Sequence, residues 1–295
     1  MKRRDFLKDI AIGGMLLNLS PSLLSQSTSN PELALVEGES PTAITKEVLR
    51  ILGGMNRFIS KGDKVLVKPN IGWDRTPEQA ACTNPEVVKT LVELVLEAGA
   101  KEVTVIDNPC NPARRTYVRS GIQDAAKEAG AKVLLPNDHK LKKVDLNGQT
   151  LKEWEVYSDF IEVDKIINVP IAKTHSLCRV TLGMKNWLGA LGGNRNQLHQ
   201  NLDYCVLDLA AFFKPVLTVL DGYRILTRNG PQGGRLSDVK LYKTIVAGTD
   251  YAAIDAIGAT FFGIDPKELL FLKLAEENGI GEINPEKMKI EKRTI

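Results

Sequence analysis

The stretch that decides the fold is KVLVKPNIGWDRTPEQAACTNPEVVKTLVELVLEAGAKEVTVID, residues 64–107. Its two ends, residues 64–69 and 102–107, are short runs rich in β-branched residues, and the first stops at a proline as a buried strand does. Between them, residues 85–98 carry apolar side chains at helical spacing, with Asn84 at the N-cap and a glycine after the last turn. A strand, a helix and a second strand in this order predict two parallel strands joined by a right-handed crossover.

The same alternation of strands and helices continues along the chain. Further strands are predicted at residues 132–136, 161–169, 216–220 and 242–247, and helices at residues 42–59, 117–129, 180–191, 197–213, 252–262 and 267–278. No internal repeat, charge block or low-complexity linker marks a second domain. We therefore predict one large α/β domain over residues 31–295, with a mostly parallel sheet flanked by helices.

The composition is that of an ordinary soluble enzyme, with 43% hydrophobic and only 6% aromatic residues among 295. The formal charge is +3, and the first nine residues supply +2 of it, with four basic side chains against two acidic ones. Nucleic-acid binding requires a basic stripe that neutralises several phosphates. Because no aromatic-interleaved cluster of Lys and Arg follows residue 30, we expect no nucleic-acid partner.

Residues 1–30 form a targeting segment ahead of this domain. Arg3 and Arg4 are followed by Asp-Phe-Leu-Lys, by an apolar run of about ten residues and by a polar tail, an order that resembles a twin-arginine signal. An ordinary basic amphipathic helix is the alternative. The run is well short of the ~20 residues that span a bilayer, so we expect no permanent transmembrane helix. The resemblance implies the twin-arginine export machinery as a partner and an extracytoplasmic location, in the periplasm or at the cell exterior, with the segment either cleaved or retained as an anchor.

The cysteines are candidates for a metal or redox site. None of the four forms a Cys-x-x-Cys pair, which excludes a local zinc ribbon or a ferredoxin-like loop. Cys82, Cys110 and Cys178 nevertheless fall in loops at one edge of the predicted sheet, and they become candidate ligands of a metal or cluster if those loops converge. Burial as small apolar residues, or one disulfide, is the alternative interpretation.

Polar residues follow several predicted strands at the point where each strand ends. In open parallel sheets, ligands bind beyond the carboxyl ends of the strands, where loops and helix N-termini meet. We therefore expect the ligand-binding residues there, and the candidates are Lys68, Asn70, Thr83, Asn84, Asp107, Lys173, Thr174, Asn186, Asp221, Gly230 and Asp250.

The candidates for catalysis are Lys185, His175 and His199. Lysine and histidine can both hold an anion, and a helix through this segment would place Thr181 and Lys185 on one face. On the next predicted helix, His199 and Asp203 are four residues apart, a spacing at which a carboxylate can orient an imidazole for proton transfer. Solvated lysines and a surface ion pair are the alternatives.

Common catalytic motifs are absent from the sequence. It contains no Gly-x-Ser-x-Gly elbow, no His-Glu-x-x-His, and no Gly-x-Gly-x-x-Gly after the first predicted strand. These absences argue against a standard hydrolase and against a nicotinamide-dependent enzyme. The glycine-rich segment at residues 230–234 fits neither a phosphate-binding loop nor a dinucleotide fingerprint, although it can bring backbone amides to a ligand.

Several short motifs resemble those of the family catalogued as domain of unknown function 362. They are VLVKPN at 65–70, TNP at 83–85, NVPIAKTH at 168–175, LGMKN at 182–186, LTVLDG at 217–222 and AGTD at 247–250, in order over about residues 64–281. The resemblance implies an α/β fold with a shared site. Many members carry ferredoxin-like iron–sulfur motifs, which imply a redox setting and a redox partner, whereas this sequence lacks those motifs.

Together these features predict an exported enzyme that binds a small anionic ligand, or a metal-containing or redox cofactor, at the carboxyl edge of its sheet. Lys68, Lys173 and Lys185 would hold anionic groups, and His175 or His199 would carry a proton or act as a ligand. The alternative is a non-catalytic extracytoplasmic protein that binds a ligand or matures a cofactor in the same crevice.

Overall fold

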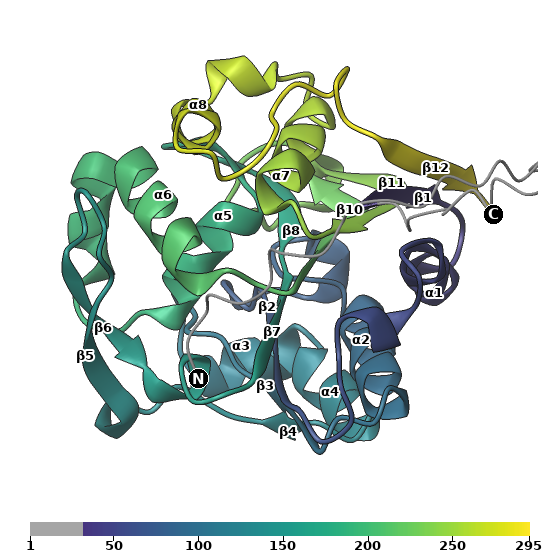
Figure 1. Ribbon diagram of the computed structural model, residues 1–295, viewed down its shortest axis with the longest axis horizontal. Helices are drawn as coiled ribbons and strands as arrows, with labels where there is room; N and C mark the ends of the chain where they lie inside the picture. The colour runs from purple at the N-terminus through teal and green to yellow at the C-terminus, as the bar shows by residue number, and fades with distance from the viewer. Residues whose placement is uncertain (1–31) are drawn as a thin grey trace, which may run out of the picture.

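The computed structural model describes residues 32–295, and the predicted twin-arginine segment lies outside the described residues. Helices cover both faces of a central sheet (Figure 1). The strands are β1 Leu33–Glu37, β2 Lys64–Pro69, β3 Glu102–Val105, β4 Lys132–Val133, β5 Leu141–Asp145, β6 Glu153–Tyr157, β7 Lys165–Val169, β8 Ile171–His175, β9 Arg179–Thr181, β10 Leu217–Leu226, β11 Val239–Gly248 and β12 Ile290–Thr294. The α-helices are α1 Pro41–Ile51, α2 Pro85–Glu97, α3 Ala113–Arg119, α4 Ile122–Glu128, α5 Gly183–Asn186, α6 Leu202–Phe213, α7 Tyr251–Thr260 and α8 Leu270–Glu277.

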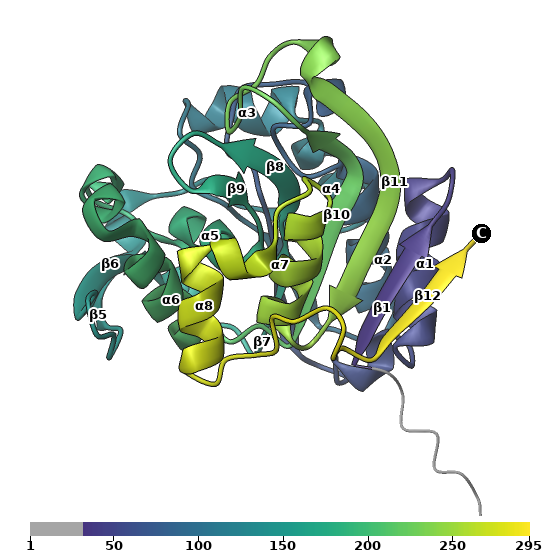
Figure 2. The same ribbon diagram turned by 90° about the horizontal axis from the view of Figure 1, so that it is seen from above.

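The central sheet has the strand order β12-β1-β11-β10-β7-β2-β3-β4. Strands β10, β7, β2, β3 and β4 pair in parallel, whereas β11 is antiparallel to both of its neighbours (Figure 2). The hairpin of β8 and β9 extends the sheet beside the carboxyl half of β10, and β5 pairs with β6 in a separate small sheet. The prediction of a mostly parallel α/β sheet in one large domain is therefore confirmed.

Two hydrophobic cores lie on opposite faces of the sheet. Alternate residues of one strand point to opposite faces, so Val65 and Val67 of β2 pack with α1, α2 and α4, whereas Leu66 packs on the side of α5 to α8. Strand β11 divides in the same way, with Ile245 and Val246 in different cores. Burial on both faces explains why the central strands are continuous apolar runs rather than alternating ones.

Helix α2 forms as the sequence predicts. The Asn84 side chain accepts a hydrogen bond from the backbone N–H of Glu86, Pro85 occupies the first turn, and Gly99 follows the helix with a φ of 94°. Within residues 32–295, none of the helices is both long and apolar enough to cross a membrane.

The predicted helix over residues 180–191 is wrong. Its first residues belong to β9, which pairs with β8, and they are followed by the short helix α5 and a 3-10 segment at Trp187–Ala190. The next predicted helix also begins later, because residues Arg195–Asn201 form a 3-10 segment ahead of α6. Pairing with a neighbouring strand, which local periodicity does not report, overrides the helical pattern here.

Strands β1 and β12, which lie at one end of the sheet, were not predicted. Strand β1 lies between β12 and β11 and uses residues close to the amino end of the described chain, while β12 uses residues close to its carboxyl end. Strand β10 is also longer than predicted, because its carboxyl half remains paired with β11 as far as Leu226. These strands depend on partners far away in sequence.

Candidate functional site

The segments that follow β2 and β3, together with β8, β9 and α5, surround a cavity of about 400 Å³, called the inner cavity below. The sheet opens here because Pro170 separates β7 from β8, and β8 then pairs with β10 instead of β2. The predicted site residues that line the inner cavity are Asn70, Asp107, Lys173, His175, Lys185, Asn186 and His199. Residues from β2, β3, β8 and α5 therefore meet at one edge, as the sequence predicts.

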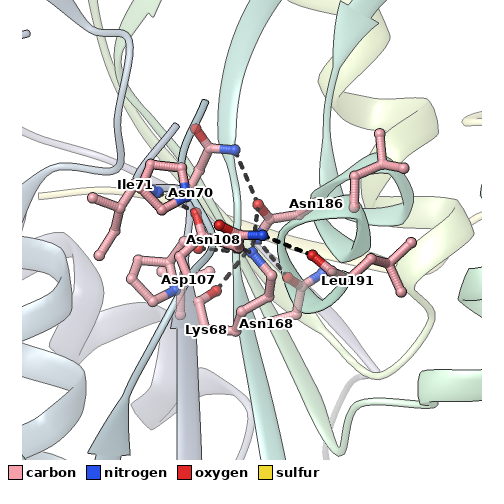
Figure 3. A network of polar contacts seen from close by, with 12 residues as sticks. Lys68, Asn70, Ile71, Asp107, Asn108, Asn168, Asn186 and Leu191 are labelled. Atoms are coloured by element: carbon pink, nitrogen blue, oxygen red, sulfur yellow. Dashed lines mark hydrogen bonds and ion pairs between the residues drawn. The ribbon is translucent and has the colours of Figure 1, made fainter. Parts of the chain in front are cut away.

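A buried ion pair supports the wall of the inner cavity. Nζ of Lys68 donates to Oδ1 of Asp107 at 2.6 Å and to Oδ1 of Asn186 at 3.1 Å (Figure 3). The other oxygen of Asp107 accepts a hydrogen bond from the backbone N–H of Ile71 at 2.6 Å. Lys68 is fully buried, and burial lowers its pKa although the Asp107 carboxylate opposes that effect. The Asp107 carboxylate is thus already engaged by the protein.

Asn70 connects this ion pair to a second buried lysine. Its Nδ2 donates to Oδ1 of Asn186 at 3.0 Å, and its Oδ1 accepts from Nζ of Lys173 at 2.9 Å. Lys173 also donates to the backbone carbonyl of Ala81 at 2.6 Å. These contacts join β2, β8 and α5 into one network that holds each polar group in a fixed direction.

Helix α5 is positioned by two buried polar side chains. The carboxylate of Asp255 accepts the backbone N–H groups of Gly183 at 2.6 Å and Met184 at 2.8 Å. Asn168 of β7 donates to the carbonyl of Gly183 and accepts from Asn186. Because α5 is only one turn long, these contacts with β7 and α7 determine where its Lys185 and Asn186 side chains point.

Three basic side chains line or face the inner cavity without a carboxylate partner. Within residues 32–295, no carboxylate oxygen lies within 4.0 Å of Lys173, Lys185 or Arg195. Arg195 donates to the backbone carbonyls of Leu188, Asn108 and Pro109. Burial lowers the pKa of Lys173 to about 8 and also lowers that of Lys185, which lies beside the Cys178 thiol. The wall therefore carries more positive than negative charge.

His175 is a neutral imidazole at the rim of the inner cavity. Burial, together with the positive charges of Lys185 and Lys173, lowers its pKa to about 3. Its Nδ1 accepts a hydrogen bond from the backbone N–H of Leu177 at 3.1 Å. His199 also lines the inner cavity, but its Nδ1 contacts the backbone carbonyl of Asn196 at 3.3 Å, not the Asp203 carboxylate. The predicted His199–Asp203 pair is wrong because this segment is 3-10 rather than α-helical.

The three candidate cysteines do not form a ligand group. Cys82 is buried and donates to the carbonyl of Trp73, Cys178 is partly buried and contacts the carbonyl of Val180, and Cys110 is exposed on the wall of the inner cavity. Across residues 32–295, no three His, Cys, Asp or Glu side chains are grouped as metal ligands. All four cysteines are free thiols in this part of the chain.

Thr83, Asn84 and Asp221 support the inner cavity from behind and do not line it. Thr83 Oγ1 accepts from the backbone N–H of Asn70 and donates to the carbonyl of Val169. The Asp221 carboxylate accepts the backbone N–H of Asn84 at 2.7 Å and that of Tyr223 at 3.0 Å. The prediction that Asp221 ends a strand is wrong, because β10 continues through it.

Asp250 lies at the opposite edge of the sheet. It follows β11, whose antiparallel direction places Gly248 beside Thr218 at the beginning of β10. Its side chain caps α7 by accepting the N–H of Ala253 and also accepts the N–H of Glu282. The predicted ligand-binding role of Asp250 is therefore corrected to a structural one.

Thr174 and Gly230 line a second cavity of about 620 Å³, called the outer cavity below. The backbone N–H of Gly230 donates to Oγ1 of Thr174 at 3.2 Å, so the loop between β10 and β11 packs onto β8. Ser176 and His175 line both cavities, which makes the two adjacent.

Sequence reasoning missed Arg195 and Gly189, which also line the inner cavity. Arg195 lies four residues before His199, so it had a local signal. Gly189 had none. A Cβ atom at this position would overlap Oδ1 of Asp107 and lie 2.8 Å from Nζ of Lys68, so the close approach requires glycine.

A sequence model for one protein family, described as a domain of unknown function (DUF362), matches residues 65–260. The chain belongs to the DUF362 family. This DUF362 segment contains both lysines of the buried network, Lys68 and Lys173, together with His175 and helices α5 to α7. The elements β1, α1, α8 and β12 lie outside it.

Among curated proteins, this DUF362 member is 25% identical over 252 residues to a protein of Synechocystis sp. described as thylakoid-associated, covering 83% of this chain and 77% of that one. Among solved structures, it is similar to the lactate racemase apoprotein from Thermoanaerobacterium thermosaccharolyticum, with a TM-score of 0.47, 11% identity and 79% of this chain covered. It is also similar to a structural-genomics protein from Thermotoga maritima, with a TM-score of 0.40, 13% identity and 81% of this chain covered. The chain spans 57% and 59% of the lengths of these two structures.

Proposed function

We propose that the protein is an exported enzyme that binds a small organic anion in the inner cavity and transfers a proton to or from it. One observation carries the proposal. Lys173, Lys185 and Arg195 line this cavity without carboxylate partners, while its own carboxylate, Asp107, is neutralised by Lys68.

The charge balance argues for an anionic ligand. Burying a charged group without a partner is costly, and Lys173 is 1% exposed and Lys185 7% exposed. A carboxylate or phosphate in the inner cavity would provide the missing negative charge and accept charge-assisted hydrogen bonds from both ammonium groups. The cavity volume of about 400 Å³ lies within the range of small-molecule sites.

Proton transfer is assigned to His175. Its low pKa makes it a poor base, and the causes of that low pKa are burial and the charges of Lys185 and Lys173. An anion that neutralises those lysines would raise the pKa of His175 toward its ordinary value, so the imidazole becomes a better proton acceptor when a ligand is bound. Binding and acid–base activity are thereby coupled through the same two charges.

The test is the pH dependence of binding of simple carboxylates. Malonate keeps its charge above pH 6.5, so a change in its dissociation constant between pH 6.5 and 9.5 reports the protein. Because the pKa of Lys173 is about 8, we expect affinity to fall roughly tenfold over this range as the cation is lost. Isothermal titration calorimetry measures the dissociation constant of malonate at each pH. Lys173→Arg, which stays charged, should give a shallower curve, and the exposed Lys240→Arg is the matched control.

The outcomes separate the hypotheses. No binding of malonate, acetate or inorganic phosphate at any pH, or a Lys185→Met variant that binds as well as the parent protein, would remove the proposal. Binding with a measurable exchange of a C–H proton for solvent deuterium in a bound carboxylic acid supports an enzyme. Binding by the parent protein with no exchange or other turnover supports the non-catalytic carrier instead.

The export part of the proposal rests on Arg3 and Arg4. Replacing both with lysine keeps the charge and removes the paired guanidinium groups that define the twin-arginine pattern. Cell fractionation should then find the full-length protein retained in the cytoplasm, whereas the parent protein should be extracytoplasmic. Equal distribution of the two proteins would contradict export by this route.

A further inference from the structure

The outer cavity is formed by the loop between β10 and β11 and by the tip of the β8–β9 hairpin. Its lining includes Arg228, Arg235 and Asp238 together with His175 and Ser176, which also line the inner cavity. The imidazole of His175 therefore lies at the junction of two spaces, and a ligand long enough to pass it would occupy both.

The charges of the outer cavity are also unbalanced. Arg228 lies 3.4 Å from the buried Asp238 carboxylate, which also accepts a hydrogen bond from Nδ2 of Asn229. No carboxylate oxygen of residues 32–295 lies within 4.0 Å of Arg235. The outer cavity thus carries one guanidinium in excess, separated from the lysines of the inner cavity by His175.

We propose that the ligand is an elongated molecule with an anionic group at each end. One end enters the inner cavity beside Lys173 and Lys185, and the other, a phosphate or a carboxylate, binds Arg235 in the outer cavity. This inference rests on the proposed function, because it extends the same bound anion past His175.

Guanidinium groups suit this role because their N–H donors match two oxygens of a carboxylate or phosphate at once. Arg235 is exposed, so its contribution is modest and screened by salt. Two fixed cationic sites also impose a length. A ligand too short to reach the second site gains nothing from its second charge, and one far too long loses the gain to its own flexibility.

The experiment compares ligands that differ in length and in the number of charges. Straight-chain α,ω-dicarboxylates from malonate to sebacate are titrated calorimetrically, each beside the monocarboxylate of the same chain length. We expect dicarboxylates of one intermediate length to bind roughly tenfold more tightly than their monocarboxylate partners, with smaller gains at both shorter and longer lengths. ω-Phosphonocarboxylates of the preferred length then distinguish a phosphate from a carboxylate at the outer end.

Variants assign the gain to the outer cavity. Arg235→Ala should abolish the gain in affinity from the second charge, whereas Lys240→Ala, which removes an exposed charge outside both cavities, should preserve both that gain and the binding of monocarboxylates. The inference would be overturned if dicarboxylates of every length bound more tightly than their monocarboxylate partners by the same factor, or if the difference in affinity persisted in Arg235→Ala. Either result would leave the proposed inner site intact. If the parent protein bound no monocarboxylate, the proposed function itself would be wrong.

Discussion

Nζ of Lys68 lies 2.6 Å from Oδ1 of Asp107, and both side chains are buried at the carboxyl ends of adjacent parallel strands. Both side chains are almost fully buried, and of the two only Asp107 is among the residues that line the inner cavity. Its role is to neutralise the one carboxylate of the inner cavity and to hold Asn186, so that the remaining lysines keep an uncompensated positive charge. The binding site therefore depends on an ion pair that forms part of its wall.

Breaking this pair should destabilise the fold. Lys68→Met leaves the buried Asp107 carboxylate without its counter-charge, and we expect the free energy of unfolding to fall by about 3–5 kcal/mol. Urea denaturation measures the change. The double variant Lys68→Met with Asp107→Leu should lose less than the sum of the two single variants, because neither charge is then stranded. Additive losses would contradict a coupled pair.

Gly189 should tolerate no side chain. In Gly189→Ala the new Cβ would overlap the Asp107 carboxylate, so the 3-10 segment or the ion pair must move, at a cost of roughly 2 kcal/mol or more. Gly279→Ala is the comparison, since nothing lies within 4 Å of a Cβ there and its positive φ of 68° costs only about 1 kcal/mol. Thermal unfolding should rank Gly189→Ala clearly below Gly279→Ala, and the reverse order would refute the steric argument.

Two buried carboxylates should make stability fall as pH rises. Burial raises the pKa of Asp221 to about 6 and that of Asp255 to about 7, against about 3.9 in the unfolded chain. Between pH 4 and those values the native state binds more protons than the unfolded state, so their contribution is complete below pH 4 and is lost through pH 6 to 7.

Replacing one of the two buried carboxylates isolates its contribution to the pH dependence of stability. Each carboxylate contributes a slope of up to about −1.4 kcal/mol per pH unit to the free energy of unfolding. Asp255→Asn cannot titrate, so guanidinium denaturation between pH 5 and 6.5 should give a less negative slope than in the parent protein, whatever the absolute loss of stability. An unchanged slope would mean that Asp255 does not titrate in this range.

The imidazole of His175 should respond to the charge of Lys185. Removing that charge in Lys185→Met takes away one of the causes that hold the pKa of His175 near 3, and we expect the pKa to rise by about one unit. Nuclear magnetic resonance of the ring nitrogens follows the titration, and the His175→Asn variant assigns the signal. Lys240→Met controls for a change in net charge, and an equal shift in that variant would argue against a local effect.

Local sequence signals were sufficient where an element carries its own periodicity and its own ends. Helix α2 follows from its apolar spacing, Asn84 and Pro85, and the parallel β2–α2–β3 unit follows from the strand patterns around it. The convergence of Asn70, Asp107 and Lys173 could be predicted as well, since the carboxyl ends of parallel strands share one edge.

Elements that depend on a distant partner could not be predicted in this way. Strand β11 carries an ordinary strand pattern, but its antiparallel direction, and with it the removal of Asp250 from the site, is set by pairing with β10 and β1. The short α5 exists because Asp255 and Asn168 hold it, and neither is near it in sequence. The amino-acid sequence by itself determined where most of the central strands and the longer helices lie, because periodicity of two or of 3.6 residues is a local property. Only the tertiary structure decided which of them share the cavity and which charges there remain unpaired, because strand direction and carboxylate pairing are contacts between segments far apart in the chain.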